Sequence, residues 1–217
     1  MVFWHGKKSA MLRYWYTVET DMDKYMFFII DYNEDTMKRN EAICTLAELA
    51  GPLGPYGTLE SRLEATANWH NSLDFDSIDV LIDILLNPPL DKEINKMPEY
   101  FEGEIIEALT SIGKRDVTNF LKKAEHLINL KQVRPVIIDV IGGLRCEDGI
   151  FLLESLLEKA DLNDDELVRI VSSLAEIGGL KTLEILEKIK KLYYNRSSEV
   201  LQQIDIWLGY FKNRIDR

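Results

Sequence analysis

Apolar residues recur at intervals of three and four along the C-terminal half of the chain, from residue 104 onward. This is the period of an α-helix with one buried face, because residues three and four apart lie on the same side of a helix. A half-buried strand would instead alternate apolar and polar residues. The spacing therefore predicts seven consecutive helices over residues 104–211, each of three or four turns. Their apolar stripes begin, in chain order, at Ile105, Val117, Val136, Ile150, Leu167, Leu183 and Leu201.

Residues typical of helix termini accompany these stripes. Pro135 stands where a first helical turn tolerates its missing N–H, and Asn163 with Glu166 has the spacing of a capping box. Glycine follows an apolar residue at the predicted end of several helices, which predicts left-handed C-caps. With Asn87, which precedes two prolines and ends an earlier stripe, these glycines recur about every 32 residues, a spacing typical of helix-pair repeats. The glycines are Gly51, Gly113, Gly142, Gly178 and Gly209.

The first 40 residues differ from the rest in holding nearly half of the aromatic residues of the chain. We interpret residues 1–40 as an aromatic-rich N-terminal cap on the stack of repeats, with an aromatic binding surface as the alternative. Residues 41–217 are predicted to form the repeats, and residues 1–217 a single continuous domain. The turn-rich segment 51–57 lacks the Gly-Lys-Ser/Thr ending of a phosphate-binding loop, so we interpret it as an insertion.

Two segments carry a resemblance to a known family: EALTSIGKRDVTNFL at residues 107–121 and SLAEIGGLKTL at residues 173–183. Both resemble the HEAT repeat, in the short bacterial form found in bilin lyase-like proteins. The resemblance implies an all-α fold, a right-handed α-α superhelix or solenoid of about five to six helix pairs. It also implies that the second helix of each pair lines a concave surface. The Asp-Pro that often follows Ile-Gly in this family is replaced here by Lys114-Arg115 and by Gly179-Leu180.

The net charge of −11 favours basic partners and repels phosphate backbones. Acidic residues concentrate at 74–107 and 154–187, and the intervening segment 114–134 is basic. We therefore expect a basic protein partner and no nucleic acid, although a solvated surface is the simpler interpretation of each band. The candidate contacts are polar residues that stand off the apolar stripes: Glu107, Ser111, Asp139, Arg169, Glu176 and Gln203.

Groups able to carry out chemistry are few. His5, His70 and His126 are far apart in the sequence, and no His-Glu-x-x-His or Gly-x-Ser-x-Gly motif occurs. Cys44 and Cys146 are expected to be buried free thiols. We therefore predict no catalytic residue, no metal and no cofactor. One acidic face is predicted on the helix around residue 80, where carboxylates at i, i+3 and i+7 either bind a cation or a basic side chain or are solvated: Asp76, Asp79 and Asp83.

The longest strongly apolar run spans six residues, 25–30, where a membrane-spanning helix needs about 20. With no apolar signal-peptide segment, we expect a cytoplasmic protein that does not contact a membrane. The leading hypothesis is a non-catalytic protein-binding scaffold or adaptor that uses a concave face. One alternative, suggested by the acidic bands, is an immunity protein that neutralises a basic toxin. The other, implied by the resemblance alone, is a bilin lyase-like tetrapyrrole-binding protein.

Overall fold

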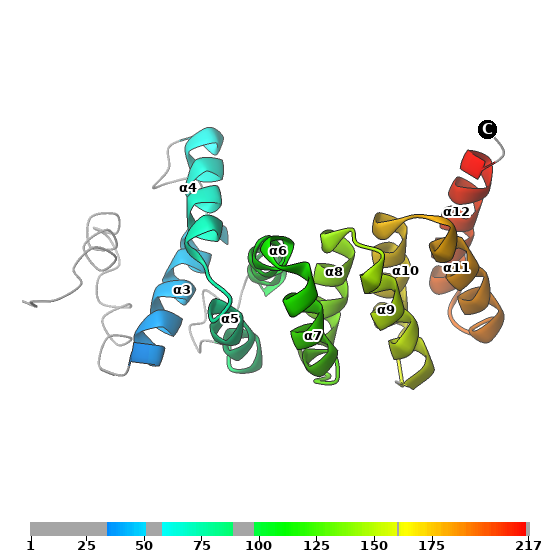
Figure 1. The fold of residues 1–217 in the computed structure, drawn as a ribbon, viewed down its shortest axis with the longest axis horizontal. Helices are drawn as coiled ribbons and strands as arrows, with labels where there is room; N and C mark the ends of the chain where they lie inside the picture. Colours follow the sequence, from blue (N-terminus) through cyan, green and yellow to red (C-terminus); the bar gives the residue numbers. More distant parts are fainter. Residues whose placement is uncertain (1–33, 51–57, 89–97, 160, 216–217) are drawn as a thin grey trace, which may run out of the picture. The chain divides into compact units, whose positions relative to one another are not determined.

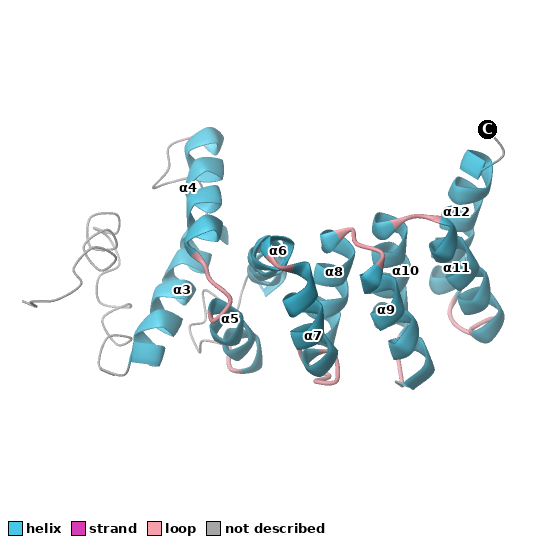
Figure 2. Ribbon diagram, viewed as in Figure 1, coloured by secondary structure: helices cyan, strands magenta, loops and turns pink. Residues whose placement is uncertain are grey.

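The structure, a computed structural model, describes residues 34–50, 58–88, 98–159 and 161–215, and this part is helical without strands (Figures 1 and 2). The predicted all-α class is thereby confirmed. None of the described helices is long and apolar enough to cross a membrane. The helices are α3 (Glu34–Ala50), α4 (Leu59–Ser72), α5 (Ser77–Leu86), α6 (Pro98–Arg115), α7 (Val117–Leu127), α8 (Arg134–Leu144), α9 (Asp148–Lys159), α10 (Asp164–Ile177), α11 (Leu180–Leu192) and α12 (Ser198–Ile215).

The chain divides into two compact units, residues 1–105 and 106–217, each described here by itself. The division falls within α6. Of the predicted cap at residues 1–40, residues 34–40 belong to α3, and the remainder lies outside the described residues, as does the loop at 51–57. The single continuous domain therefore stays a prediction.

In the first unit, α3 packs on α5. The apolar sides of both helices are buried, and an ion pair between Arg39 and Asp83 joins them at the edge of this core. Arg39 also donates a hydrogen bond to the main-chain oxygen of Asn87, where α5 ends. The buried apolar residues are Ala42, Ile43, Leu46 and Leu49 on α3, and Ile78, Leu81, Ile82 and Ile84 on α5.

Helix α4 was not expected from the apolar spacing. It buries no residue, and its apolar side chains Leu59 and Leu63 are each 61% exposed. The helix is identifiable instead by its N-cap, because the Thr58 hydroxyl accepts a hydrogen bond from the Ser61 N–H at 3.1 Å. Because α4 has no buried apolar stripe, the apolar spacing does not predict it.

The turn before α5 is held by hydrogen bonds between Asp74 and Ser77. The Asp74 carboxylate accepts hydrogen bonds from the Ser77 hydroxyl at 2.8 Å and from the Ser77 N–H at 2.9 Å. These bonds, the hydroxyl first, hold the pKa of Asp74 below its ordinary value. The interaction therefore stabilises the fold above the pKa of Asp74 in the unfolded chain and is lost as pH falls through the lower, folded pKa.

We expect Ser77→Ala to raise the pKa of Asp74, because the hydroxyl that stabilises its charged form is removed while the main-chain bond remains. An NMR titration of the Asp74 carboxyl carbon measures this directly. Ser155→Ala, a serine on α9, is the matched control and should leave the pKa of Asp74 unchanged. If the pKa of Asp74 does not shift in Ser77→Ala, the Ser77 hydroxyl is not what lowers it.

In the second unit the helices form two rows. Contacts run from α8 to α10 to α12 in the first row and from α7 to α9 to α11 in the second, and further contacts join the rows. Residues 106–115 of α6 belong with the first row, because Thr110 lies against Gly143 of α8. Figure 1 shows the alternation along the chain. The apolar stripes meet between the rows, which is where the core of this unit lies.

The seven helices predicted from residue 104 onward are all present, and two predicted start signals are confirmed. Pro135 lies in the first turn of α8. Asn163 and Glu166 form the capping box of α10, with the Asn163 side chain accepting from the Glu166 N–H at 2.8 Å and the Glu166 carboxylate accepting from the Asn163 N–H at 2.9 Å. These signals depend on neighbouring residues alone, which explains why they were readable in the sequence.

The prediction that glycines end the helices is correct for Gly178 but wrong for Gly113, Gly142 and Gly209, which lie inside α6, α8 and α12. Gly178 ends α10 with a φ of 75°. The left-handed residue after α8 is instead Arg145, with a φ of 52°. At Gly113 and Gly142 the reason is packing, because a Cβ on Gly113 would lie 2.8 Å from Leu144 Cδ2 and a Cβ on Gly142 would lie 2.7 Å from Ser173 Cα, whereas nothing lies within 4 Å of a Cβ on Gly209.

Candidate protein-binding face

Helix α8 lies in the middle of the second unit and contacts α7, α9 and α10. All of its residues are buried except Pro135, Asp139 and Gly143, which are half-buried and spaced four apart. Residues at this spacing share one side of a helix. Helix α8 therefore presents a single narrow stripe outside the core, with Asp139 at its centre.

Helix α10 presents a longer polar stripe. Asp165, Arg169, Ser172 and Glu176 lie at i, i+4, i+7 and i+11, so they share one side of the helix. Asp165 and Glu176 are exposed, and Arg169 and Ser172 are half-buried. The opposite side of α10 is fully buried and includes Leu167, Ile170, Val171 and Leu174.

Arg169 connects the stripes of α8 and α10. One guanidinium nitrogen donates to Asp139 on α8, and Nε donates to Asp165 on α10 at 3.1 Å. Below them the buried Ser173 hydroxyl donates to the main-chain oxygen of Ile138 at 2.9 Å. Asp139 and Arg169, which the sequence suggested separately, are therefore brought together as one ion pair on one surface.

The stripe continues onto α6 and α12. Thr110 of α6 lies against Gly143, and Glu107 (exposed) and Ser111 (half-buried) stand in adjacent turns of α6. On α12, Asp205 and Lys212 form ion pairs with Lys190 and Glu187 of α11, so their side of the helix faces the second row. At about 100° per residue, the side of α12 away from α11 carries Gln203, Ile206 and Tyr210.

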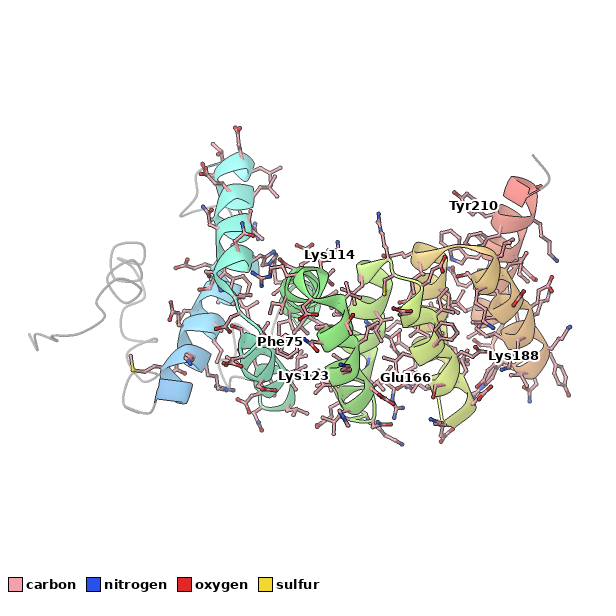
Figure 3. All side chains as sticks on the ribbon, viewed as in Figure 1. Phe75, Lys114, Lys123, Glu166, Lys188 and Tyr210 are labelled. Atoms are coloured by element: carbon pink, nitrogen blue, oxygen red, sulfur yellow. The ribbon has the colours of Figure 1, made fainter. Side chains whose placement is uncertain are left out.

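We call this surface the first-row face. It contains all six contacts proposed from the sequence together with three that were not proposed: Asp165, Ile206 and Tyr210 (Tyr210 is labelled in Figure 3). The sequence could have identified Ile206 as exposed, because it falls outside the buried apolar stripe of α12. The full face consists of Glu107, Ser111, Asp139, Asp165, Arg169, Glu176, Gln203, Ile206 and Tyr210.

The second row carries charges that compensate one another. Lys188 of α11, which Figure 3 labels, lies 2.7 Å from Glu158 and 3.2 Å from Glu154, both on α9. Hydrogen bonds to Glu158 and Glu154 raise the pKa of Lys188, and the bond from Lys188 lowers the pKa of Glu158. Much of the acidic band at residues 154–187 is thus paired. Glu107 and Glu176, by contrast, form no ion pair within the described part of the chain.

Folding also buries part of the positive charge of the basic band at residues 114–134. Arg134 is buried and donates to Glu166 at 3.1 Å and to the main-chain oxygen of Ile128 at 2.8 Å. Lys114 and Lys122 are exposed on α6 and α7. One cation of the band is therefore part of the core and does not contribute to a surface.

The predicted acidic face on α5 has members with different roles. Asp83 binds Arg39 of α3 and accepts a hydrogen bond from Asn87 at 2.7 Å, so it joins elements of the first unit. Asp76, at the N-cap position of α5, and Asp79, in its first turn, are exposed.

The residues considered for chemistry are dispersed over separate helices. His70 lies on α4 and His126 on α7, while His5 lies outside the described residues. Cys44 and Cys146 form no disulfide in the part of the chain that the structure describes, and both are half-buried where full burial was expected. No protein-family model, curated protein or solved structure matches this chain. The surface that we consider for a binding function is therefore the first-row face.

Proposed function

We propose that this protein is a non-catalytic binding scaffold that holds a basic protein partner on its first-row face. The observation that carries the proposal is the continuity of polar side chains across α6, α8, α10 and α12, joined at the centre by Arg169 between Asp139 and Asp165. Helices packed on a shared core hold their side chains in fixed positions, which lowers the entropy cost of binding.

The charge of the face supports a basic partner. Glu107 and Glu176 are exposed carboxylates without an ion-pair partner in the described residues, whereas Arg169 is already neutralised by two carboxylates. Complementary charges across an interface speed association and disfavour partners of the wrong sign. The net charge of −11 adds a long-range attraction for cationic proteins.

A HEAT-like superhelix is the architecture that we propose for this scaffold. Two alternating rows with a shared core, as in α7–α12, are what stacked helix pairs produce, because one pair cannot bury its own apolar stripe. In such a stack the first row would line one continuous surface. This arrangement supports the HEAT resemblance of residues 107–121 and 173–183.

We expect the double charge reversal Glu107→Lys and Glu176→Lys to weaken partner binding by about tenfold or more, because favourable pairs become repulsive ones. The measurement is affinity capture from a lysate of the source organism, followed by titration of the captured partner. Glu125→Lys with Glu184→Lys is the matched control, since it changes the net charge equally at exposed sites on α7 and α11.

The control pair reports the effect of net charge alone and should weaken binding far less than the pair on the first-row face, and both pairs should keep the parent's circular dichroism spectrum. If the pair on the first-row face also leaves binding unchanged, this face is not the binding surface. A partner that is acidic would contradict the proposed charge complementarity.

A further inference from the structure

Helix α12 exposes two large apolar side chains on the first-row face. Ile206 is 53% exposed and Tyr210, one turn further on, is 47% exposed. The Tyr210 ring is held in place by edge contacts with Trp207 and Phe211, whose centroids lie 5.7 Å and 5.5 Å away. Exposed aromatic side chains that are already immobilised lose little entropy on binding and are frequent centres of interfaces.

Exposed carboxylates lie on α12 itself and on the neighbouring helix α10. Helices α10 and α12 run in the same direction (Figure 1), so Glu176 and Tyr210 stand at the C-terminal parts of their helices, and Asp165 and Glu199 stand at the N-terminal ends. Glu176 and Glu199 are exposed and form no ion pair among the described residues. The apolar patch therefore has one exposed carboxylate two turns before it on the same helix, Glu199, and another on the neighbouring helix α10, Glu176.

We propose that Ile206 and Tyr210 receive a large apolar side chain of a partner segment in which lysine or arginine residues flank that side chain. The apolar residue would cover the exposed Ile206 and Tyr210, while the flanking cations would reach Glu176 on α10 and Glu199 on α12. The inference rests on the proposed function and specifies the partner's chemistry.

A second copy of the chain is a poorer occupant. In a twofold contact the same surface meets itself, so the exposed carboxylates Glu176 and Glu199 of one copy would be brought to the same interface as those of the other. Like charges placed across an interface oppose binding, whereas a basic segment removes the repulsion. Charge complementarity therefore selects a different protein segment.

A random peptide library displayed on phage, selected against the full chain, tests the inference without knowledge of the natural partner. We expect enriched peptides to contain one large apolar residue flanked by lysine or arginine. A synthetic peptide with the enriched sequence is then titrated by calorimetry against three double variants. They are Ile206→Ser with Tyr210→Ser, Glu176→Lys with Glu199→Lys, and, as an exposed apolar control on α11, Leu180→Ser with Leu192→Ser.

We expect the first two variants each to weaken peptide binding at least tenfold, and the control to leave it unchanged. If only the charge variant weakens binding, the apolar site on α12 is wrong while the proposed scaffold function stands. If neither variant weakens binding, or no peptide is enriched, the inference is overturned. The lysate experiment with the Glu107 and Glu176 variants then decides independently on the proposed function.

Two further measurements separate peptide binding at this patch from unfolding of α12 and from self-association of the chain. Should the serine variant of α12 lose its helical spectrum, Tyr210→Ser alone and a peptide with serine in place of its apolar residue replace it. Both should again weaken binding. Sedimentation velocity of the free chain gives the oligomeric state, and a dimer that Ile206→Ser dissociates would show that a second copy covers the patch and would overturn the inference.

Discussion

Replacing Arg134 by methionine is expected to lower the free energy of unfolding by about 3–5 kcal/mol, because it leaves the carboxylate of Glu166 buried without its counter-charge. The side chains of Arg134 and Glu166 are 7% and 6% exposed, and their atoms lie 3.1 Å apart. Arg134 also satisfies the main-chain oxygen of Ile128, which loses a donor in the variant. Urea denaturation followed by circular dichroism measures the change.

Two controls separate the buried charge from a general effect of substitution. Adding Glu166→Gln to Arg134→Met should recover part of the lost stability, since the uncompensated charge is then removed. Lys190→Met, which breaks an exposed ion pair with Asp205, should change stability little. If Arg134→Met is as mild as Lys190→Met, the pair does not hold α8 to α10 as the structure indicates.

The second large effect is expected at Gly142, where alanine should lower the free energy of unfolding by about 1–3 kcal/mol. A Cβ at this position would stand 2.7 Å from the Cα, Cβ and Oγ of Ser173, so main chain as well as side chain must shift. The shift would also strain the buried hydrogen bond from Ser173 to Ile138. The midpoint and slope of a denaturant titration provide the measurement.

Gly209→Ala on α12 is the matched control, because nothing lies within 4 Å of its added Cβ. Inside a helix, alanine at an open position is expected to stabilise by about 0.5–1 kcal/mol relative to glycine. Both substitutions replace glycine by alanine inside a helix, and their effects on the free energy of unfolding should have opposite signs. A stabilising Gly142→Ala would show that α8 and α10 are not packed as closely as described.

The helices of the second unit could be predicted because the apolar residues of each recur with the period of an α-helix. Val136 to Leu144 and Leu167 to Ile177 are apolar at the positions that a 3.6-residue turn places together, and Asn163 with Glu166 marks a start by local hydrogen bonds. Helix α4 was missed because Leu59 and Leu63 are exposed, which leaves no buried stripe to recognise.

The candidate face was predictable only in part. Glu107, Asp139 and Glu176 could be placed outside the core, since a polar residue off an apolar stripe is solvated on any amphipathic helix. That Arg169 joins Asp139 could not be foreseen, because the two residues are 30 apart in the chain and their meeting depends on which helices pack together. Tyr210, like Ile206, falls outside the apolar stripe of α12, so its exposure could be predicted, but its place beside α10 could not.

By itself the sequence determined the helical class, the positions of the seven C-terminal helices and the side of each that is buried, since these follow from spacing and from local hydrogen bonds. Only the tertiary structure decided what Gly142 and Arg134 do. A glycine serves as a helix end or as a point of close approach according to its neighbours, and an arginine lies in solvent or in the core according to whether a carboxylate from another helix meets it. Those neighbours belong to distant parts of the chain, and folding alone brings them together.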